Sequence, residues 1–391
     1  TLSLKEAKNG SDLILTIDRT IQRMACEKAE EAVRRFEAES ASIVVLDPET
    51  GALIAMCAFP DFDPAHVGDI ASIKLLNNPN TYYQYEPGSI FKAMTVAAGI
   101  EAGKITPMST YVDTGLEMID GHPIRNSDLK AHGTQTMTQV LSESLNTGTI
   151  HIQRLLGKEL FRDFVVRFGF GEKSGLELST EVKGDISNLS RKGNSYAATV
   201  SFGQGMTATP LQMVAAYAAI ANGGKLMKPY VIQEVVRPNG EHVVTKPQVV
   251  REVLSNRTSR LVSGMLVDVV ENGHGKRAGV DGYYVAGKTG TAQVAKPNGP
   301  GYLEGVTIGS FAGYAPVDHP KFAMIVKVDK PKTVQFAESS AAPIFGEMAK
   351  FLLTYYRVPP ERPLKHKEPV ALPTPSSSAP VSPPSTTTSS R

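Results

Sequence analysis

Apolar positions alternate with charged ones at helical spacing near the beginning of the chain. Residues 21–37 are rich in Ala, Glu and Arg and predict an amphipathic helix, with Asp18 or Thr20 as its candidate N-cap. A second helix is predicted over residues 342–356, at the end of the apolar part of the chain. Helices are therefore expected at both ends of a folded region.

Short apolar runs bounded by turn residues predict β-strands. Two such runs, 42–46 and 52–56, flank a turn at 47–51 that contains Pro and Gly, and this arrangement predicts a β-hairpin. Three further strands are predicted in the last third of the chain, over residues 282–286, 307–314 and 322–328.

The middle of the chain is predicted to be mostly helical and loop-forming. Its clearest helix spans 211–221, where Thr209 is the N-cap, Pro210 occupies the first turn and residues 222–224 (Asn-Gly-Gly) end the helix. Together the elements predict an α+β fold, with an antiparallel sheet built from both ends of the chain, flanked by helices, and a mostly helical inserted subdomain.

Composition narrows the class of protein. Of the 391 residues, 41% are hydrophobic, which is enough for a sizeable core. Lys and Arg total 41 against 39 for Asp and Glu, and this balance argues against nucleic-acid binding, which usually requires a clustered basic excess. No stretch approaches the roughly 20 consecutive apolar residues of a membrane span.

The sequence predicts three regions. Residues 1–41 form an N-terminal linker and first helix, residues 42–358 form the folded domain, and residues 359–391 form a tail. Pro, Ser and Thr dominate the end of the tail, which has too few apolar residues to offset its ordering entropy and is predicted to be disordered. The chain opens without Met or a signal-type segment, so we expect a fragment or a processed form.

The two cysteines, Cys26 and Cys57, do not have metal-type spacing. Cys57 lies in the apolar run 53–58 and is interpreted as a small buried hydrophobic residue. A disulfide between the two is left open, and so few cysteines do not indicate a redox compartment.

Ser89 and Lys92 form the first candidate motif. A helix-compatible stretch begins at Ser89, directly after Gly88, so the serine falls where backbone N–H groups favour developing negative charge. Three residues along a helix, Lys92 faces the same side and can take the hydroxyl proton if its amine is neutral. Bringing a free lysine pKa of about 10.4 near 7 requires about 4–5 kcal/mol, which burial or a neighbouring cation can supply.

Two further motifs follow in order. Ser144 and Asn146 lie two apart on a predicted loop, where the hydroxyl can relay a proton and the amide can bind a peptide carbonyl or the lysine. Residues 288–291 (Lys-Thr-Gly-Thr) follow a β-type run, so Lys288 and Gly290 share one strand face and the two threonines share the other. The cation and hydroxyls suit a carboxylate. Each motif is weak alone, but the ordered set indicates a serine acyltransferase.

Residues 282–289 also fit the phosphate-loop pattern G-x-x-x-x-G-K-[ST]. Such a loop needs a strand that ends at the first glycine and a helix that begins at the Lys-Thr pair. The residues between the glycines are β-type, and those after Thr289 do not predict a helix. The nucleotide-binding alternative is therefore rejected.

With their surroundings, the three motifs resemble the penicillin-binding proteins, specifically the monofunctional class B transpeptidases, from about residue 42 to residue 356. The matching stretches beyond the motifs are 85–89, 201–205, 209–212, 221–224, 286–293 and 310–316. The last of these resembles the division and sporulation branch. Two stretches depart from the family: Leu145 replaces a small residue, and 336–340 stands where relatives tend to show a Gly pair.

The resemblance implies the penicillin-binding transpeptidase fold and a peptidoglycan D,D-transpeptidase that β-lactams acylate. Ser89 would be the nucleophile, Lys92 its base, Ser144 and Lys288 the route of a proton to the leaving group, and Asn146 a substrate ligand. The third motif would bind substrate: Thr289 and Thr291 would hold its carboxylate, Gly290 would let it approach, and the backbone N–H groups of Ser89 and Thr291 would form the oxyanion hole.

The resemblance also implies partners and a location. The partners would be stem peptides ending in D-Ala-D-Ala, β-lactams, a separate glycosyltransferase and other division proteins, with no cofactor, metal or nucleic acid. The site would face the outside of a bacterial cytoplasmic membrane, to which an N-terminal anchor, missing from this chain, would attach the protein.

Two alternatives remain open. A serine β-lactamase shares the first and third motifs, but the chain lacks a Glu-x-x-Leu-Asn motif, is too long, and has Asn146 where one class has Val. A β-lactam sensor or idle scaffold is the second alternative, and the intact Ser89, Lys92 and Lys288 argue against idleness.

Overall fold

A five-stranded antiparallel sheet forms the centre of the computed structural model, which describes residues 9–70, 72–296, 299 and 301–364. Its strand order is β12-β13-β14-β2-β3, so strands from the end of the chain pair with strands from its beginning. The strands are β2 (Ser40–Leu46), β3 (Leu53–Phe59), β12 (Ala286–Ala295), β13 (Tyr302–Ala315) and β14 (Phe322–Asp329). The predicted α+β class, antiparallel sheet and first hairpin are confirmed.

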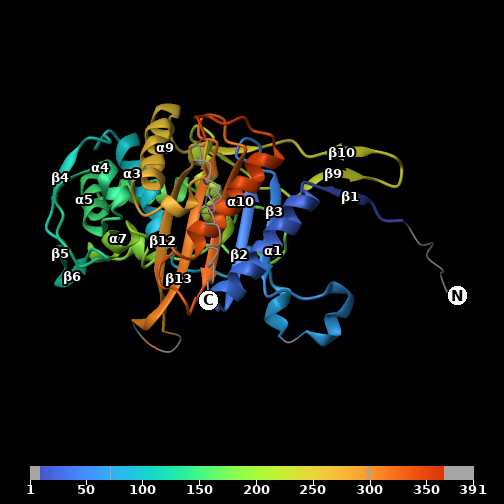
Figure 1. Cartoon of the computed structure of the whole chain (residues 1–391), viewed down its shortest axis with the longest axis horizontal. Coiled ribbons are helices and arrows are strands. Elements are labelled where there is room, and N and C mark those ends of the chain that lie inside the picture. Colours follow the sequence, from blue (N-terminus) through green and yellow to red (C-terminus); the bar gives the residue numbers. More distant parts are fainter. Residues whose placement is uncertain (1–8, 71, 297–298, 300, 365–391) are drawn as a thin grey trace, which may run out of the picture.

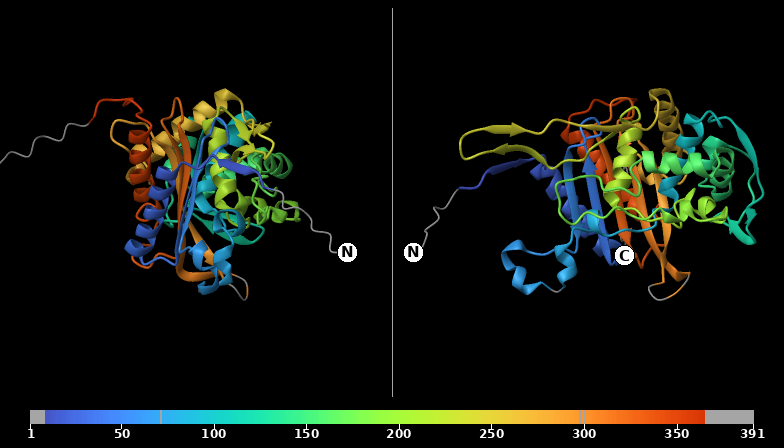
Figure 2. Two further views of the ribbon diagram at one scale, coloured as in Figure 1. Left: turned by 90° about the vertical axis from the view of Figure 1, so that its right-hand side faces the viewer. Right: turned by 180° about the vertical axis from the view of Figure 1, so that it is seen from behind.

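Helices cover both faces of this sheet, which gives three layers (Figure 2, left). On one face lie α1 (Arg19–Phe36) and α10 (Ala341–Tyr355), packed on Ile43 and Val45; Val44 and Leu46 point the other way, toward α8 (Pro210–Ala221). Two apolar cores, one on each face, follow from this period-two alternation. Both faces of the sheet are buried, as its continuous apolar runs require.

A helical lobe lies beside the β12 edge of the sheet (Figure 1). Its helices are α3 (Lys92–Glu101), α4 (Met137–Ser142), α5 (Asn146–Leu156), α6 (Lys158–Arg167), α7 (Ser195–Val200) and α9 (Asn256–Glu271). Two small hairpins pair β4 (Thr110–Asp113) with β7 (Gly133–Thr136), and β5 (Leu116–Ile119) with β6 (His122–Arg125). This lobe is the predicted helical insert.

An arm of short strands projects from the opposite end of the molecule (Figure 1). It comprises β1 (Asp12–Leu15), β9 (Ile232–Val236) and β10 (His242–Val244). A separate two-stranded sheet pairs β8 (Lys225–Met227) with β11 (Val249–Glu252). The remaining short elements are α2 (Pro79–Tyr82) and the 3-10 turns η1 (Pro64–Asp69), η2 (Ile73–Leu76), η3 (Gly88–Phe91), η4 (Ser187–Ser190) and η5 (Lys276–Ala278). None of the helices in the described residues is long and apolar enough to cross a bilayer.

Local capping signals are reproduced in the structure. Asp18 is the N-cap of α1, and its carboxylate accepts hydrogen bonds from the backbone N–H groups of Thr20 and Ile21. Thr209 caps α8 in a capping box with Gln212, and Pro210 occupies the first turn. The predictions of these two helix starts are confirmed.

The strand predicted at 282–286 is wrong in its first part. Gly282 has a positive φ of 86°, and its carbonyl accepts hydrogen bonds from the backbone of Glu361 and Arg362 rather than from a strand. Strand β12 therefore begins only at Ala286. The tail predicted at 359–391 is described only as far as residue 364, and the rest of that prediction lies outside the described residues.

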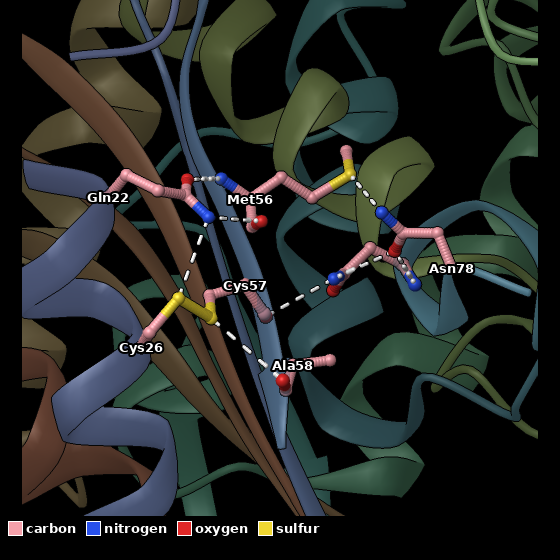
Figure 3. The surroundings of a disulfide bond; sticks show 7 residues. Gln22, Cys26, Met56, Cys57, Ala58 and Asn78 are labelled. Carbon is pink, nitrogen blue, oxygen red and sulfur yellow. Dashed lines mark hydrogen bonds between the residues drawn. A yellow bond between two sulfur atoms is a disulfide. The ribbon is translucent and has the colours of Figure 1, made fainter. Parts of the chain in front are cut away.

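Cys26 and Cys57 form a disulfide that joins α1 to β3 (Figure 3). The disulfide that the sequence left open is therefore formed, and the Cys57 side chain is buried as expected. One helical turn earlier, the Gln22 amide donates to the Met56 carbonyl and accepts from its N–H, at 2.9 and 2.8 Å. The helix is thus fixed to an edge strand of the sheet by a covalent bond and a paired amide.

Candidate active site

Ser89 lies in the 3-10 turn η3, and the backbone N–H of Lys92, the first residue of α3, donates to its carbonyl. Ser89 therefore lies at the start of a helix, as predicted, but in a 3-10 turn that precedes α3 rather than in the α-helix itself. Gly88 precedes it with φ +59°, and its N–H donates to the Gly203 carbonyl at 3.0 Å. A Cβ on Gly203 would lie 2.2 Å from the Gly88 carbonyl oxygen, so the turn is packed backbone against backbone.

Helix α8 supports the same turn from within the core. The hydroxyl of Tyr217, which is fully buried, donates to the Ile90 carbonyl at 2.8 Å. Because α8 is buried along almost its whole length, the residue after the candidate nucleophile is fixed to the centre of the molecule. The position of Ser89 is therefore set by the core rather than by a surface loop.

Lys92 is fully buried, and its side-chain amine donates to the backbone carbonyl of Ser144 and lies 3.2 Å from the Ser144 hydroxyl. Burial holds the Lys92 pKa well below its usual value, and the charge of Lys288 lowers that pKa further. The structure thus brings the first two motifs into contact. A neutral amine, which a general base requires, is favoured here.

The second motif occupies the connection between α4 and α5. Ser144 adopts the left-handed conformation at φ +57°, and its N–H donates to the Leu141 carbonyl. Asn146 begins α5, and its side-chain amide donates to the Arg125 carbonyl at 2.8 Å. Leu145, which we expected to depart from the family pattern, is buried in an apolar core.

Strand β12 carries the third motif at the edge of the sheet. Lys288 is fully buried, and its ammonium donates to the Thr289 carbonyl at 3.0 Å and lies 3.3 Å from the Thr289 hydroxyl. Burial lowers the Lys288 pKa to about 7, and the nearby Glu338 carboxylate opposes that effect. At neutral pH this side chain can therefore either hold or release a proton.

Gly290 lies against the turn that carries Ser89. A Cβ at this position would come within 2.9 Å of the Ile90 nitrogen and 3.0 Å of the Pro87 carbonyl oxygen. Thr291, on the other strand face, accepts a hydrogen bond from the Ala337 N–H at 3.0 Å. The absence of a side chain at Gly290 thus lets the first and third motifs meet.

The phosphate-loop alternative does not fit this geometry. The motif lysine and threonine lie within β12, paired with Ala312 and Phe311 of β13, and no helix begins there. The lysine is also buried rather than open to a phosphate.

Two sets of supporting residues were not anticipated from the sequence. Glu86 is mostly buried and accepts hydrogen bonds from the Tyr302 hydroxyl and the Gly205 N–H, both at 2.9 Å, which joins the nucleophile turn to two other segments. Asp268 of α9 accepts a hydrogen bond from the Ser142 hydroxyl, two residues before the second motif. No sequence signal identifies these partners, because each pair is more than one hundred residues apart.

Comparison with known proteins agrees with this arrangement. The family model described as "Penicillin binding protein transpeptidase domain" matches residues 41–350. The chain is 37% identical over 359 residues to "Stage V sporulation protein D" of Bacillus subtilis, covering 91% of this chain and 55% of that protein. It is 34% identical over 368 residues to "Penicillin-binding protein PbpB" of Mycolicibacterium smegmatis, covering 90% of this chain and 56% of that protein. The chain thus spans about half the length of these relatives.

Solved structures give the same result. Penicillin-binding protein 3 of Mycobacterium tuberculosis superimposes with a TM-score of 0.86 and 33% identity, over 93% of this chain and 83% of that one. The same protein has been solved in complex with aztreonam. With a family match over most of the chain and a shared fold, the chain belongs to the penicillin-binding protein transpeptidase family.

Proposed function

We propose that the protein is a peptidoglycan D,D-transpeptidase that forms an acyl-enzyme on Ser89. The observation that carries this proposal is the buried Lys92 amine, which contacts Ser144 and follows Ser89 by one helical turn. Several relatives are named peptidoglycan D,D-transpeptidases, among them the PenA protein of Neisseria meningitidis. The buried amine is the feature that the chemistry needs most, because a serine hydroxyl is inert without a base.

In the acylation step, the Ser89 oxygen attacks the carbonyl of the penultimate D-Ala of a stem peptide, and neutral Lys92 takes the hydroxyl proton. The backbone N–H groups of Ser89 and Thr291 stabilise the negative charge on the carbonyl oxygen. The C–N bond then breaks, and a proton passed through Ser144 goes to the departing D-Ala amine. The products are an ester on Ser89 and free D-Ala.

In the second step, an amine of a neighbouring stem peptide attacks the ester carbonyl. The new amide bond forms as the ester bond to the Ser89 oxygen breaks. The attacking amine loses a proton to the Lys92 side chain, and the Ser89 oxygen regains its proton. Protonated Lys288, with the hydroxyls of Thr289 and Thr291, would hold the substrate carboxylate during acylation. Asn146 would bind a substrate amide. No metal or cofactor is required by these steps.

The setting of this reaction follows from the relatives' names. A role in division or sporulation wall synthesis is favoured by the match to a stage V sporulation protein and to a protein named as an FtsI homolog. We place the site on the extracytoplasmic side of the membrane, where peptidoglycan lies, and expect a separate glycosyltransferase and division proteins as partners.

Mass spectrometry of the intact protein after incubation with benzylpenicillin, followed by peptide mapping, tests the proposal. We expect one adduct on the peptide that contains Ser89, none in Ser89→Ala, and an unchanged adduct in Ser179→Ala, which alters an exposed serine. Purified stem peptide and acceptor should then yield the cross-linked product. Labelling that survives in Ser89→Ala would overturn the nucleophile, and fast multiple turnover of nitrocefin would indicate a β-lactamase instead.

A further inference from the structure

Residues 336–340 lie beside the third motif. The Ala337 N–H donates to the Thr291 hydroxyl at 3.0 Å. A Cβ added to Gly309 of β13 would lie 2.4 Å from the Ser340 hydroxyl, so the segment is packed tightly on the sheet before α10 begins. Glu338 follows Ala337 directly, and its position is therefore fixed relative to β12.

The turn after α9 is fixed in the same way to the segment that carries the second motif. A Cβ on Gly273 would lie 2.5 Å from the Ser142 carbonyl oxygen, and the His274 N–H donates to that carbonyl at 3.4 Å. The Asp268 carboxylate accepts from the Ser142 hydroxyl and from the Asn272 amide. The position of His274 is therefore fixed relative to α4 and to the loop that carries Ser144.

The side chains of these two fixed segments meet. The His274 Nδ1 lies 3.1 Å from a Glu338 carboxylate oxygen, and both side chains are about half exposed. An exposed pair of this kind contributes little to stability. The pair joins two segments that are each packed against a segment carrying a motif, one against Ser142 and the other against Thr291.

We propose that Glu338 is a positioning residue of the active site, and that with His274 it forms a side-chain bridge between the second motif's loop and the third motif's strand. The inference rests on the proposed function, whose site it deepens. The bridge fixes the position of the Glu338 carboxylate, whose charge favours the protonated form of the buried Lys288. Protonated Lys288 is the form that binds a substrate carboxylate.

His274 contacts Glu338 from the turn after α9, and the charge of Glu338 also acts on Lys288 of β12. The other acidic groups of α9 have partners of their own: Asp268 is bonded to Ser142, and Glu271 forms an ion pair with Arg362. Glu338 is therefore the carboxylate whose removal should change the charge state of Lys288.

The test is the pH profile of Ser89 acylation by a fluorescent penicillin in Glu338→Gln, Glu338→Asp and His274→Ala, with melting temperatures measured alongside. Loss of the proton from Lys288 sets the high-pH limb of this profile. In Glu338→Gln we expect this limb to move to lower pH, so that the rate at pH 8 relative to the maximum falls by about threefold. Glu304→Gln, which removes an exposed carboxylate from β13, is the matched control and should leave the limb in place.

The remaining variants distinguish a specific effect of the Glu338–His274 bridge from a general disturbance of the structure. Glu338→Asp should restore most of the wild-type profile, and His274→Ala should move the limb in the same direction by less. The double variant Glu338→Gln/His274→Ala should move it no further than Glu338→Gln alone, because the two residues act as one unit. A rate that falls equally at every pH, or shifts that add, would overturn the bridge. Wild-type protein that fails to acylate at Ser89 would instead overturn the proposed function.

Discussion

Gly290→Ala should disable the site while leaving the fold in place. The added Cβ would lie 2.9 Å from the Ile90 nitrogen, 2.9 Å from the Ile90 Cγ2 atom and 3.0 Å from the Pro87 carbonyl oxygen. Two of these atoms belong to the backbone that carries Ser89, so a rotamer change cannot relieve them. Because φ at Gly290 is not in the left-handed region, the whole effect is steric.

The size of the effect follows from this crowding. Ordinary contacts at a Cβ begin near 3.4 Å, so β12 and the nucleophile turn must separate by about half an ångström. Overpacking of this kind costs about 1–3 kcal/mol of stability. A displacement of reacting groups approaching 1 Å lowers a rate by about 100-fold. We therefore expect a modest fall in Tm and a loss of acylation far larger than that fall implies.

The assay is single-turnover acylation by a fluorescent penicillin, with thermal unfolding of the same preparations. Gly264→Ala is the matched control, because Gly264 lies on the exposed side of α9 with nothing within 4 Å of an added Cβ. It should stabilise the helix by up to about 1 kcal/mol and leave acylation unchanged. An acylation rate in Gly290→Ala within threefold of wild type would refute the contact between the first and third motifs.

Three further predictions concern the base, the disulfide and a helix cap. Acylation should slow as pH falls and Lys92, whose pKa burial and Lys288 depress, becomes protonated; a rate that is flat from pH 5 to pH 8 would exclude Lys92 as the base. Reduction of the disulfide between Cys26 and Cys57, 31 residues apart, should lower the free energy of unfolding by about 3–4 kcal/mol, measured as a fall in Tm with reductant. A double Cys→Ala variant that shows the same response to reductant would contradict this. Thr209→Ala removes the buried cap of α8 and should cost about 1–2 kcal/mol by denaturant unfolding, whereas Thr209→Ser should cost less.

Sequence reasoning succeeded where the signal is local. The caps of α1 and α8 depend on residues within three positions of one another, and the hairpin of β2 and β3 depends on two runs and one turn. The strand context of Lys288 was likewise decided by its immediate neighbours, which exclude a phosphate loop.

Sequence reasoning failed where hydrogen-bond partners are far apart in the chain, or where a single backbone dihedral angle determines the local structure. Ser142 and Asp268 are 126 residues apart, and no pattern in either segment indicates the other. The β-type residues after Gly282 suggested a strand, but the positive φ of that glycine directs its carbonyl to the end of the chain. The disulfide was unsupported because it depends on how α1 packs across β3, which spacing alone does not reveal.

The roles of the two buried lysines can be separated on physical grounds. Burial disfavours the charged form of both Lys92 and Lys288. The two lysines differ in their charged neighbours. The Glu338 carboxylate favours the protonated form of Lys288, whereas the charge of Lys288 disfavours the protonated form of Lys92. Environments that push two pKa values apart assign acid and base. This difference supports the proposed roles, in which Lys92 accepts the Ser89 proton and Lys288 is the cation that binds a carboxylate.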